Sequence, residues 1–393
     1  MNKITKNSAI IFVILLGVVS LFADMTYEGA RSISGQYLAI LGASGTVVGV
    51  VAGLGELIGY GFRLFSGYIS DQSKKYWFFT ISGYSINLLA VPLLALADNW
   101  PLAASLMILE RLGKAIRSPS KDAMLSYATK ETGRGWGFGL HEAMDQVGAV
   151  IGPLIVSCVI YFQGSYQMGF GILLIPALCA LSVLAYAKKL YPHPEDLEIE
   201  NPNLKMKGFT KKYWLYIAAV CCVAAGFVDF PLIAFHMKQT SVVPDAWIPI
   251  IFSLSMGAAG LAALFFGRLF DTKGFSVLIF ATALASLFAP LVFLDNFYVV
   301  IIGMILWGIG LGTQESIMRA VVADLIQMDK RGTAYGILNV WFGVFWFLGS
   351  ALMGFLYDIS LVSLIIFSLG IQLAAIPILF AVKNSKAERM RKN

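Results

Sequence analysis

The chain has 393 residues, of which 58% are hydrophobic and 13% are charged, and its formal net charge is +6. Water-soluble domains carry about a quarter charged residues, so this composition excludes an ordinary soluble fold. The basic surplus lies in short segments between apolar runs, which excludes the continuous basic stripe of a nucleic-acid-binding domain.

Apolar runs follow one another along the whole chain. A helix needs about 20 mostly apolar residues to cross a bilayer. Ten runs predict membrane-spanning helices at residues 47–69, 77–97, 136–162, 169–187, 214–236, 247–270, 275–294, 297–322, 334–357 and 362–382. We therefore predict an all-α integral membrane protein.

Charged side chains disguise two more spans. Residues 9–38 contain Asp24, Glu28 and Arg31, and residues 101–125 contain a second charged group. The N-terminal residues resemble a secretory signal, but no small-residue cleavage site follows, so we interpret them as a retained first span. With both spans kept, the loop Lys and Arg residues fall on one side of a twelve-span arrangement. This asymmetry predicts both termini in the cytoplasm.

A polar segment near the middle of the chain separates two groups of six spans. Residues 190–212 contain several prolines and charges of both signs, which is typical of a linker. We predict an N-terminal six-helix bundle at residues 1–189, a cytoplasmic linker at 190–212, and a C-terminal six-helix bundle with a short basic tail at 213–393.

The two halves repeat one short motif. Gly67 and Asp71 follow the second span, and Gly267 and Asp271 follow the eighth, each pair next to a basic turn. The repetition indicates a duplicated six-helix unit.

With twelve predicted spans, a midpoint linker and a repeated loop, the chain resembles the major facilitator superfamily. The signature loop of that family has a Gly, three further residues, an Asp, basic residues and a Gly. The first copy departs from it at Gln72, where a basic residue is usual, and at Lys74, where Gly is usual. The resemblance implies two pseudo-symmetric bundles, with spans one, four, seven and ten lining a central cavity. It also implies a cytoplasmic gate motif formed by Gly67, Asp71, Lys75, Arg117, Gly267 and Asp271.

The fifth span carries a second pattern. Gly139, Gly148, Gly152 and Pro153 resemble the spacing associated with proton-linked exporters of the same superfamily. Small residues four apart also let two helix backbones approach closely, so plain helix packing is the alternative interpretation.

Charged side chains within the first and fourth spans carry the functional prediction. An ionised side chain at the membrane centre costs about 2.5 to 3.5 kcal/mol on insertion scales, so these groups must face a cavity or one another. We predict that Asp24, Glu28 and Glu110 include the proton-coupling carboxylate. The alternative is a static ion-pair network that only fastens helices together. Counter-charge, or the binding of an anionic substrate group, is expected from Arg31, Arg111 and Lys114.

The second half of the chain is less charged. Asp229 and His236 share a face of the seventh span, and Glu315 and Arg319 share a face of the tenth. Pro231 predicts a break in the seventh span, where freed carbonyls can join the site. The full set of candidates for proton coupling or for the substrate cavity is Asp24, Tyr27, Glu28, Arg31, Glu56, Glu110, Arg111, Lys114, Asp229, His236, Glu315, Arg319 and Trp341.

These features predict a secondary active transporter that moves a small organic solute by alternating access. We expect proton coupling, with export as an antiporter favoured over the alternative of proton-coupled uptake of a small polar or charged metabolite. A non-transporting membrane sensor is an alternative of another class. An enzyme is not expected, because no nucleophile stands with a base and an orienting partner.

The expected partners are a small-molecule substrate, protons and the lipid bilayer. Neither a cofactor nor a bound metal is expected, because the cysteines lie in apolar segments without metal-ligand spacing. We expect the protein to function as a monomer. We also expect it to be a multi-pass protein of the plasma membrane of a prokaryote, that is, of the cytoplasmic or cell inner membrane.

Overall fold

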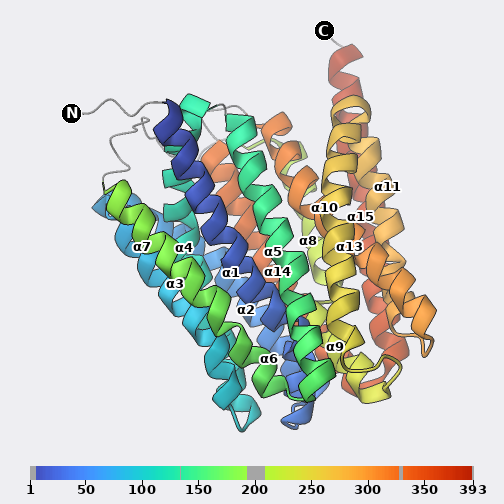
Figure 1. The fold of residues 1–393 in the computed structure, drawn as a ribbon. Helices are drawn as coiled ribbons and strands as arrows, with labels where there is room; N and C mark the ends of the chain where they lie inside the picture. The colour runs from blue at the N-terminus through green and yellow to red at the C-terminus, as the bar shows by residue number, and fades with distance from the viewer. Residues whose placement is uncertain (1–5, 133, 193–208, 327–330, 392–393) are drawn as a thin grey trace. The chain divides into compact units, whose positions relative to one another are not determined.

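The computed structural model describes residues 6–132, 134–192, 209–326 and 331–391. All regular secondary structure in these ranges is helical (Figure 1). The first half of the chain contains α1 (Lys6–Ile40), α2 (Gly45–Ser73), α3 (Tyr76–Leu93), η1 (Leu94–Leu96), α4 (Trp100–Thr132), α5 (Arg134–Gln163), α6 (Tyr166–Ile172) and α7 (Leu174–Leu190). The second half contains α8 (Lys211–Gly226), α9 (Phe230–Thr240), α10 (Trp247–Lys273), α11 (Phe275–Ser286), α12 (Phe288–Val292), α13 (Phe297–Leu325), α14 (Arg331–Ile359) and α15 (Leu361–Arg391).

Twelve helical segments correspond to the predicted spans. In the described part of the chain, 11 segments are long and apolar enough to cross a membrane. The twelfth is α4, a continuous helix of 33 residues whose charges lower its hydropathy. The prediction of an all-α membrane protein with two charge-disguised spans is therefore confirmed. The cytoplasmic location of the termini remains a prediction.

Some spans consist of two helices each. The break expected near Asp229 is confirmed, because α8 ends at Gly226 and α9 begins at Phe230 with a proline in its first turn. Proline has no backbone N–H and is best tolerated in the first turn of a helix, so it favours a helix start at this position. Two further breaks, at Leu173 and Leu287, were not predicted.

The chain forms two compact units. Unit 1 contains residues 1–42, 58–201 and 245–253, and unit 2 contains residues 43–57, 202–244 and 254–393. The first turns of α2 therefore pack within unit 2, and the first turns of α10 pack within unit 1. Each unit thus holds a short piece from the other half of the sequence.

Small residues allow the start of α2 to approach α14 within unit 2. Gly45, Gly49 and Gly53 are four residues apart, so they lie on one face of α2. A Cβ atom on Gly49 would overlap the backbone oxygen of Ser350, and one on Gly354 would overlap the backbone oxygen of Gly45. The two backbones are therefore in direct contact, as at small-residue interfaces between membrane helices.

Asp358, at the end of α14, caps the N-terminus of α2. Its carboxylate accepts hydrogen bonds from the Gly45 N–H at 2.9 Å and from the Thr46 N–H at 2.7 Å. The Thr46 hydroxyl donates to the same carboxylate at 2.6 Å. Free N–H groups at a helix start favour such a negative partner.

The turn between α2 and α3 shows why the signature loop has a glycine at the position that Lys74 occupies in this chain. Lys74 has a φ of 53°, and Gly274, at the corresponding turn of the second half, has a φ of 59°. This left-handed region costs a non-glycine residue about 1 to 2 kcal/mol. The position therefore favours glycine, and Lys74 occupies it under strain.

Replacing Lys74 with glycine is expected to stabilise the protein. Part of the relieved strain is offset by the greater freedom of glycine in the unfolded chain, so we expect a gain of about 0.5 to 1 kcal/mol. Lys75→Gly is the matched control, because Lys75 has a φ of −91° and gains nothing from glycine. Thermal denaturation of the two purified variants in detergent compares them, and an equal shift in both would argue against strain at Lys74.

Candidate functional site

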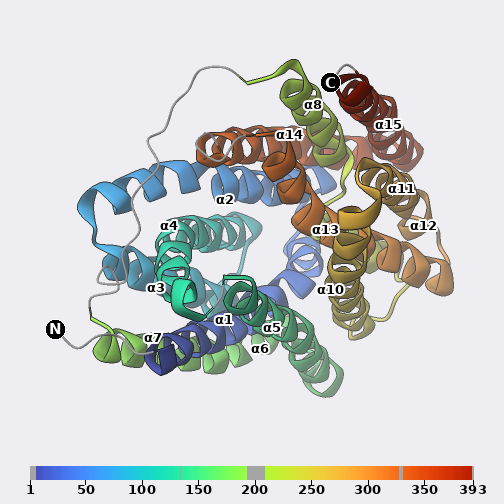
Figure 2. The ribbon, with the colours of Figure 1, turned by 90° about the horizontal axis from the view of Figure 1, so that it is seen from above.

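The close packing of α1 on α5 positions the candidate site in unit 1. The two helices lie side by side in both views (Figures 1 and 2). A Cβ atom on Gly148 would overlap the carbonyl oxygen of Leu21, and one on Gly152 would overlap that of Met25. Two glycines of the fifth-span pattern therefore form the contact with α1 that small residues permit. Gly139, the first residue of that pattern, has no atom near its Cβ position.

Tyr27 of α1 lies at the centre of a cationic group from α4. The Lys114 Nζ atom is 3.8 Å and the Arg111 guanidinium carbon is 4.7 Å from the centroid of the Tyr27 ring. Both are distances at which the negative face of an aromatic ring attracts a cation. The tyrosine thus holds two positive charges side by side within unit 1.

Two buried carboxylates accompany these cations. Glu28 lies 3.8 Å from the Arg31 guanidinium, and Glu110 lies 3.5 Å from that of Arg111. The side-chain amide of Asn87, on α3, donates to the Glu110 carboxylate and also, at 3.1 Å, to its backbone oxygen. Glu28 is 5% and Glu110 is 6% exposed, so each carboxylate has exchanged water for protein partners.

The structure brings together six of the predicted site residues, which we call the Tyr27 cluster. Its members are Tyr27, Glu28, Arg31, Glu110, Arg111 and Lys114. Asp24 lies next to it and interacts electrostatically with Lys114 and Glu28. Because acids and bases alternate over a short distance, the cluster can redistribute its pairs when one carboxylate gains a proton or when a charged solute binds.

Of the predicted gate motif, Arg117 interacts electrostatically with Glu110 of the cluster and with Asp24, and the contacts of the other described members lie elsewhere. A Cβ atom added to Gly67 would lie 3.3 Å from the Cβ atom of Pro119. The glycine therefore allows α2 and α4 to pack closely. Asp71 and Lys75 are exposed. Arg117 is buried against Tyr84 of α3, with its guanidinium carbon 4.1 Å from the ring centroid.

The second copy of the gate motif is less well described. Nothing lies within 4 Å of a Cβ atom added to Gly267. The side chain of Asp271 lies outside the described residues.

In unit 2, the break in the seventh span leaves backbone carbonyl groups without partners in their own helix. Side chains of other helices donate hydrogen bonds to them. The Trp307 indole donates to the Val228 carbonyl at 2.9 Å, and the Trp346 indole donates to the Asp229 carboxylate at 2.8 Å. The Gly226 carbonyl accepts from the Ser368 hydroxyl at 2.6 Å. Asp229 is therefore a buried carboxylate held by an aromatic donor.

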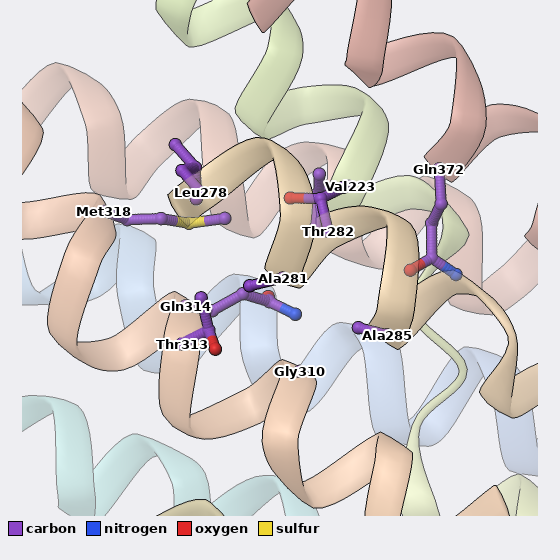
Figure 3. A pocket seen from close by; sticks show the side chains of 10 residues that line it. All are labelled: Val223, Leu278, Ala281, Thr282, Ala285, Gly310, Thr313, Gln314, Met318 and Gln372. Carbon is purple, nitrogen blue, oxygen red and sulfur yellow. The ribbon is translucent and has the colours of Figure 1, made fainter. Parts of the chain in front are cut away.

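A small, mostly apolar cavity lies near this break, between α8, α11, α13 and α15 (Figure 3). Thr282, Thr313, Gln314 and Gln372 supply its polar lining, and the remaining walls are apolar. The cavity has room for about one water molecule. It is therefore too small to hold an organic solute.

The remaining candidate residues, four in the second half of the sequence and Glu56 in the first, do not form one cluster in the described structure. His236 is buried, with its Nδ1 atom 3.0 Å from the Tyr357 hydroxyl. Trp341 is 42% exposed and Glu315 is also exposed. The side chain of Arg319 lies outside the described residues. In α2, Glu56 is buried in the part of the helix that belongs to unit 2.

Sequence reasoning missed two partners from α3. Asn87 and Tyr84 are fully buried and contact Glu110 and Arg117. The available signal was a polar amide in the middle of an apolar span, where an unsatisfied polar group is costly. Their partners depend on how α3 and α4 are rotated against each other, which one sequence does not show.

Comparison with known proteins establishes the family. A family model described as Major Facilitator Superfamily matches residues 14–274 and 215–393. The chain belongs to the Major Facilitator Superfamily. This superfamily member is 41% identical over 379 residues to an uncharacterized protein of Mycobacterium tuberculosis (strain ATCC 25618 / H37Rv). The similarity covers 95% of this chain and 93% of the other chain.

Two other similarities bear on the superfamily member. Multidrug resistance protein MdtH of Proteus mirabilis (strain HI4320) is 33% identical over 151 residues, which is 37% of each chain. The crystal structure of nucleoside transporter NupG (D323A mutant) superposes with a TM-score of 0.77 at 12% identity, covering 94% of this chain and 99% of that chain. The latter similarity shows a shared fold. The superfamily member is accordingly a multi-pass membrane transporter of a small-molecule substrate and not an enzyme.

Proposed function

We propose that this transporter exports a small organic solute in exchange for protons, by alternating access, and that the Tyr27 cluster is its coupling site. The observation that carries the proposal is the burial of Glu28 beside Arg31 and of Glu110 beside Arg111, which shares the Tyr27 ring with Lys114. We further propose that it works as a monomer in the cytoplasmic membrane of a prokaryote.

The contacts of the cluster suggest how a proton is exchanged for a solute. Each carboxylate is paired with a cation, so a proton on Glu28 or Glu110 removes the negative charge that faces Arg31 or Arg111. Loss of a facing negative charge makes a buried cation less favourable, which favours a rearrangement of the cluster or the uptake of another anion. Proton binding and rearrangement are thus linked in the manner that a coupled carrier requires.

Export is supported by two independent similarities. The Gly148 and Gly152 pattern resembles that of proton-linked exporters in the superfamily. A multidrug resistance protein shares one third identity with part of the chain. We therefore take an amphipathic organic cation, ethidium, as the first probe.

One observation favours a second candidate function. Three cations, Arg31, Arg111 and Lys114, lie within one cluster, and such groups bind the carboxylate or phosphate of a polar metabolite. Proton-coupled uptake of an anionic metabolite is therefore the runner-up. In a solute-binding assay, stabilisation of the protein by small organic anions and not by ethidium would favour it.

The proposed function is tested in proteoliposomes with ethidium as the transported probe. Protein-dependent movement of ethidium is expected to rise at least fivefold when a pH gradient is imposed, and to return to the basal rate when nigericin collapses the gradient. Liposomes without protein control for leakage of the dye. Movement that is unaffected by the gradient would contradict proton coupling.

A further inference from the structure

A histidine outside the Tyr27 cluster joins three helices of unit 1. His141 of α5 is 4% exposed. Its Nε2 atom lies 2.9 Å from the Ser20 hydroxyl oxygen of α1 and 3.4 Å from the Lys121 Nζ of α4. Its Nδ1 atom lies 3.7 Å from Oδ2 of Asp145, one turn further along α5. Nothing in the Tyr27 cluster uses this group.

The two ring nitrogens face groups of opposite kinds. A lysine ammonium can only donate hydrogen bonds, so the Nε2 atom that faces Lys121 is best occupied by a lone pair. The proton of a neutral ring then belongs on Nδ1, which faces the carboxylate of Asp145. The geometry therefore points to one tautomer, with Nδ1–H directed at an acceptor.

The charges around His141 favour a neutral imidazole ring that passes a proton to Asp145 when it receives another. Besides Lys121 and Asp145, the charged groups that act on His141 are Asp122 and Arg117, both from α4. Lys121 is also paired with Asp122, 3.3 Å away, which keeps it in place. A second proton on His141 would have to sit on Nε2, where it faces the Lys121 ammonium, so the doubly protonated ring is disfavoured and readily gives up one of its two protons.

Asp145 connects the histidine with the coupling site. One of its carboxylate oxygens, Oδ1, is buried and has no hydrogen-bond partner in the described structure. Asp145 also interacts electrostatically with Asp24 of α1, the carboxylate next to the Tyr27 cluster. Ser20 and Asp24 are four residues apart on α1, and His141 and Asp145 are four apart on α5, so the two pairs face each other along the α1–α5 contact.

We propose that Ser20, His141 and Asp145 form a proton relay that supplies Asp24. In the forward step a hydronium ion gives a proton to the Ser20 hydroxyl as that hydroxyl passes its own proton to Nε2, while the Nδ1 proton passes to the Asp145 carboxylate. The net change is one hydronium ion converted to water, one neutral carboxylic acid formed at Asp145 and the ring proton moved from Nδ1 to Nε2. Exchange of the ring proton with water then restores the Nδ1–H tautomer, which the Lys121 ammonium favours. Asp145 then passes this proton to Asp24. The relay rests on the proton coupling proposed above, and His141 is a proton-transfer group that does not touch the solute.

The tautomer is tested without any solute. The chain has three histidines, so ¹⁵N-histidine labelling gives three imidazole signals, which His141→Gln, His193→Gln and His236→Gln assign. His141 is expected to be neutral at pH 7 with its proton on Nδ1. Replacing Lys121 with methionine removes the group that disfavours a proton on Nε2, so a detectable Nε2–H population is expected. A wild-type His141 protonated on Nε2 alone would overturn the relay.

Transport separates the relay from the fold and from the proposed function. In His141→Gln, ethidium movement driven by a pH gradient is expected to fall at least tenfold, while ethidium exchange at equal pH stays within twofold of the wild type. Ser20→Ala, a smaller change, is expected to show the same pattern, and His193→Gln is the matched control. Retained pH-driven movement, or an equal fall in both assays, would overturn the relay alone. A wild type with no response to the gradient would overturn the coupling itself.

Discussion

Replacing Gly152 with leucine is expected to prevent the transporter from folding. A Cβ atom at this position would overlap the carbonyl oxygen of Met25, which belongs to the backbone of α1 and cannot rotate away. Forcing extra atoms into a well-packed interior displaces side chains and backbone and typically costs about 1 to 3 kcal/mol, occasionally more. Here two helix backbones must separate, so we expect a loss above that range. Size-exclusion chromatography of the solubilised variant should show little monodisperse protein.

The same helix offers a matched control. Gly139 belongs to the same sequence pattern, but nothing lies within 4 Å of an added Cβ atom. Gly139→Leu is therefore expected to give nearly wild-type amounts of monodisperse protein. If both variants behave alike, the pattern does not act through the close contact of α1 and α5.

Neutralising Lys114 is expected to have the second large effect. The Lys114 ammonium lies over Tyr27 and interacts with the carboxylates of Asp24 and Glu28. Removing the Lys114 cation leaves these carboxylates with less counter-charge, which is unfavourable. Lys114→Met should therefore lower the thermal stability and abolish movement of ethidium driven by a pH gradient. Lys114→Arg, which keeps the charge, should retain both to a large extent.

A second substitution tests whether this loss is electrostatic. In the double variant Lys114→Met with Glu28→Gln, one of the carboxylates that interact with Lys114 is neutralised together with it, so part of the lost stability should return. Coupling energies between residues in contact are about 0.5 to 3 kcal/mol. Strictly additive losses in the double variant would show that Lys114 and Glu28 act independently, contrary to the description of the Tyr27 cluster.

Much of the fold followed from the sequence because a membrane requires long apolar helices. The charge-bearing span of α4 was identified only because loop charges require it, since its hydropathy alone is too low. The break before Pro231 was predicted because a proline favours the end or a kink of a helix. The breaks at Leu173 and Leu287 were not predicted, because prolines such as Pro119 and Pro153 also lie inside continuous helices of this chain, so a proline alone does not mark where a helix ends.

The candidate site was only partly predictable. Helical periodicity placed Tyr27, Glu28 and Arg31 on one face of the first span, and the structure places Lys114 beside them. Periodicity did not show that Glu110 turns towards Asn87 of the neighbouring α3. Such partners depend on helix rotation and on contacts between residues distant in sequence, which no local pattern contains.

The central claim, that the Tyr27 cluster couples solute movement to protons, is tested most directly by measuring proton flux. Proteoliposomes loaded with the pH indicator pyranine report protons that cross the membrane when ethidium is added. Wild-type protein is expected to move protons opposite to the dye, and the double variant Glu28→Gln with Glu110→Gln is expected to lose at least nine tenths of this flux while still binding ethidium. Equal proton flux in the two proteins, or dye movement by the wild type without proton flux, would contradict the claim.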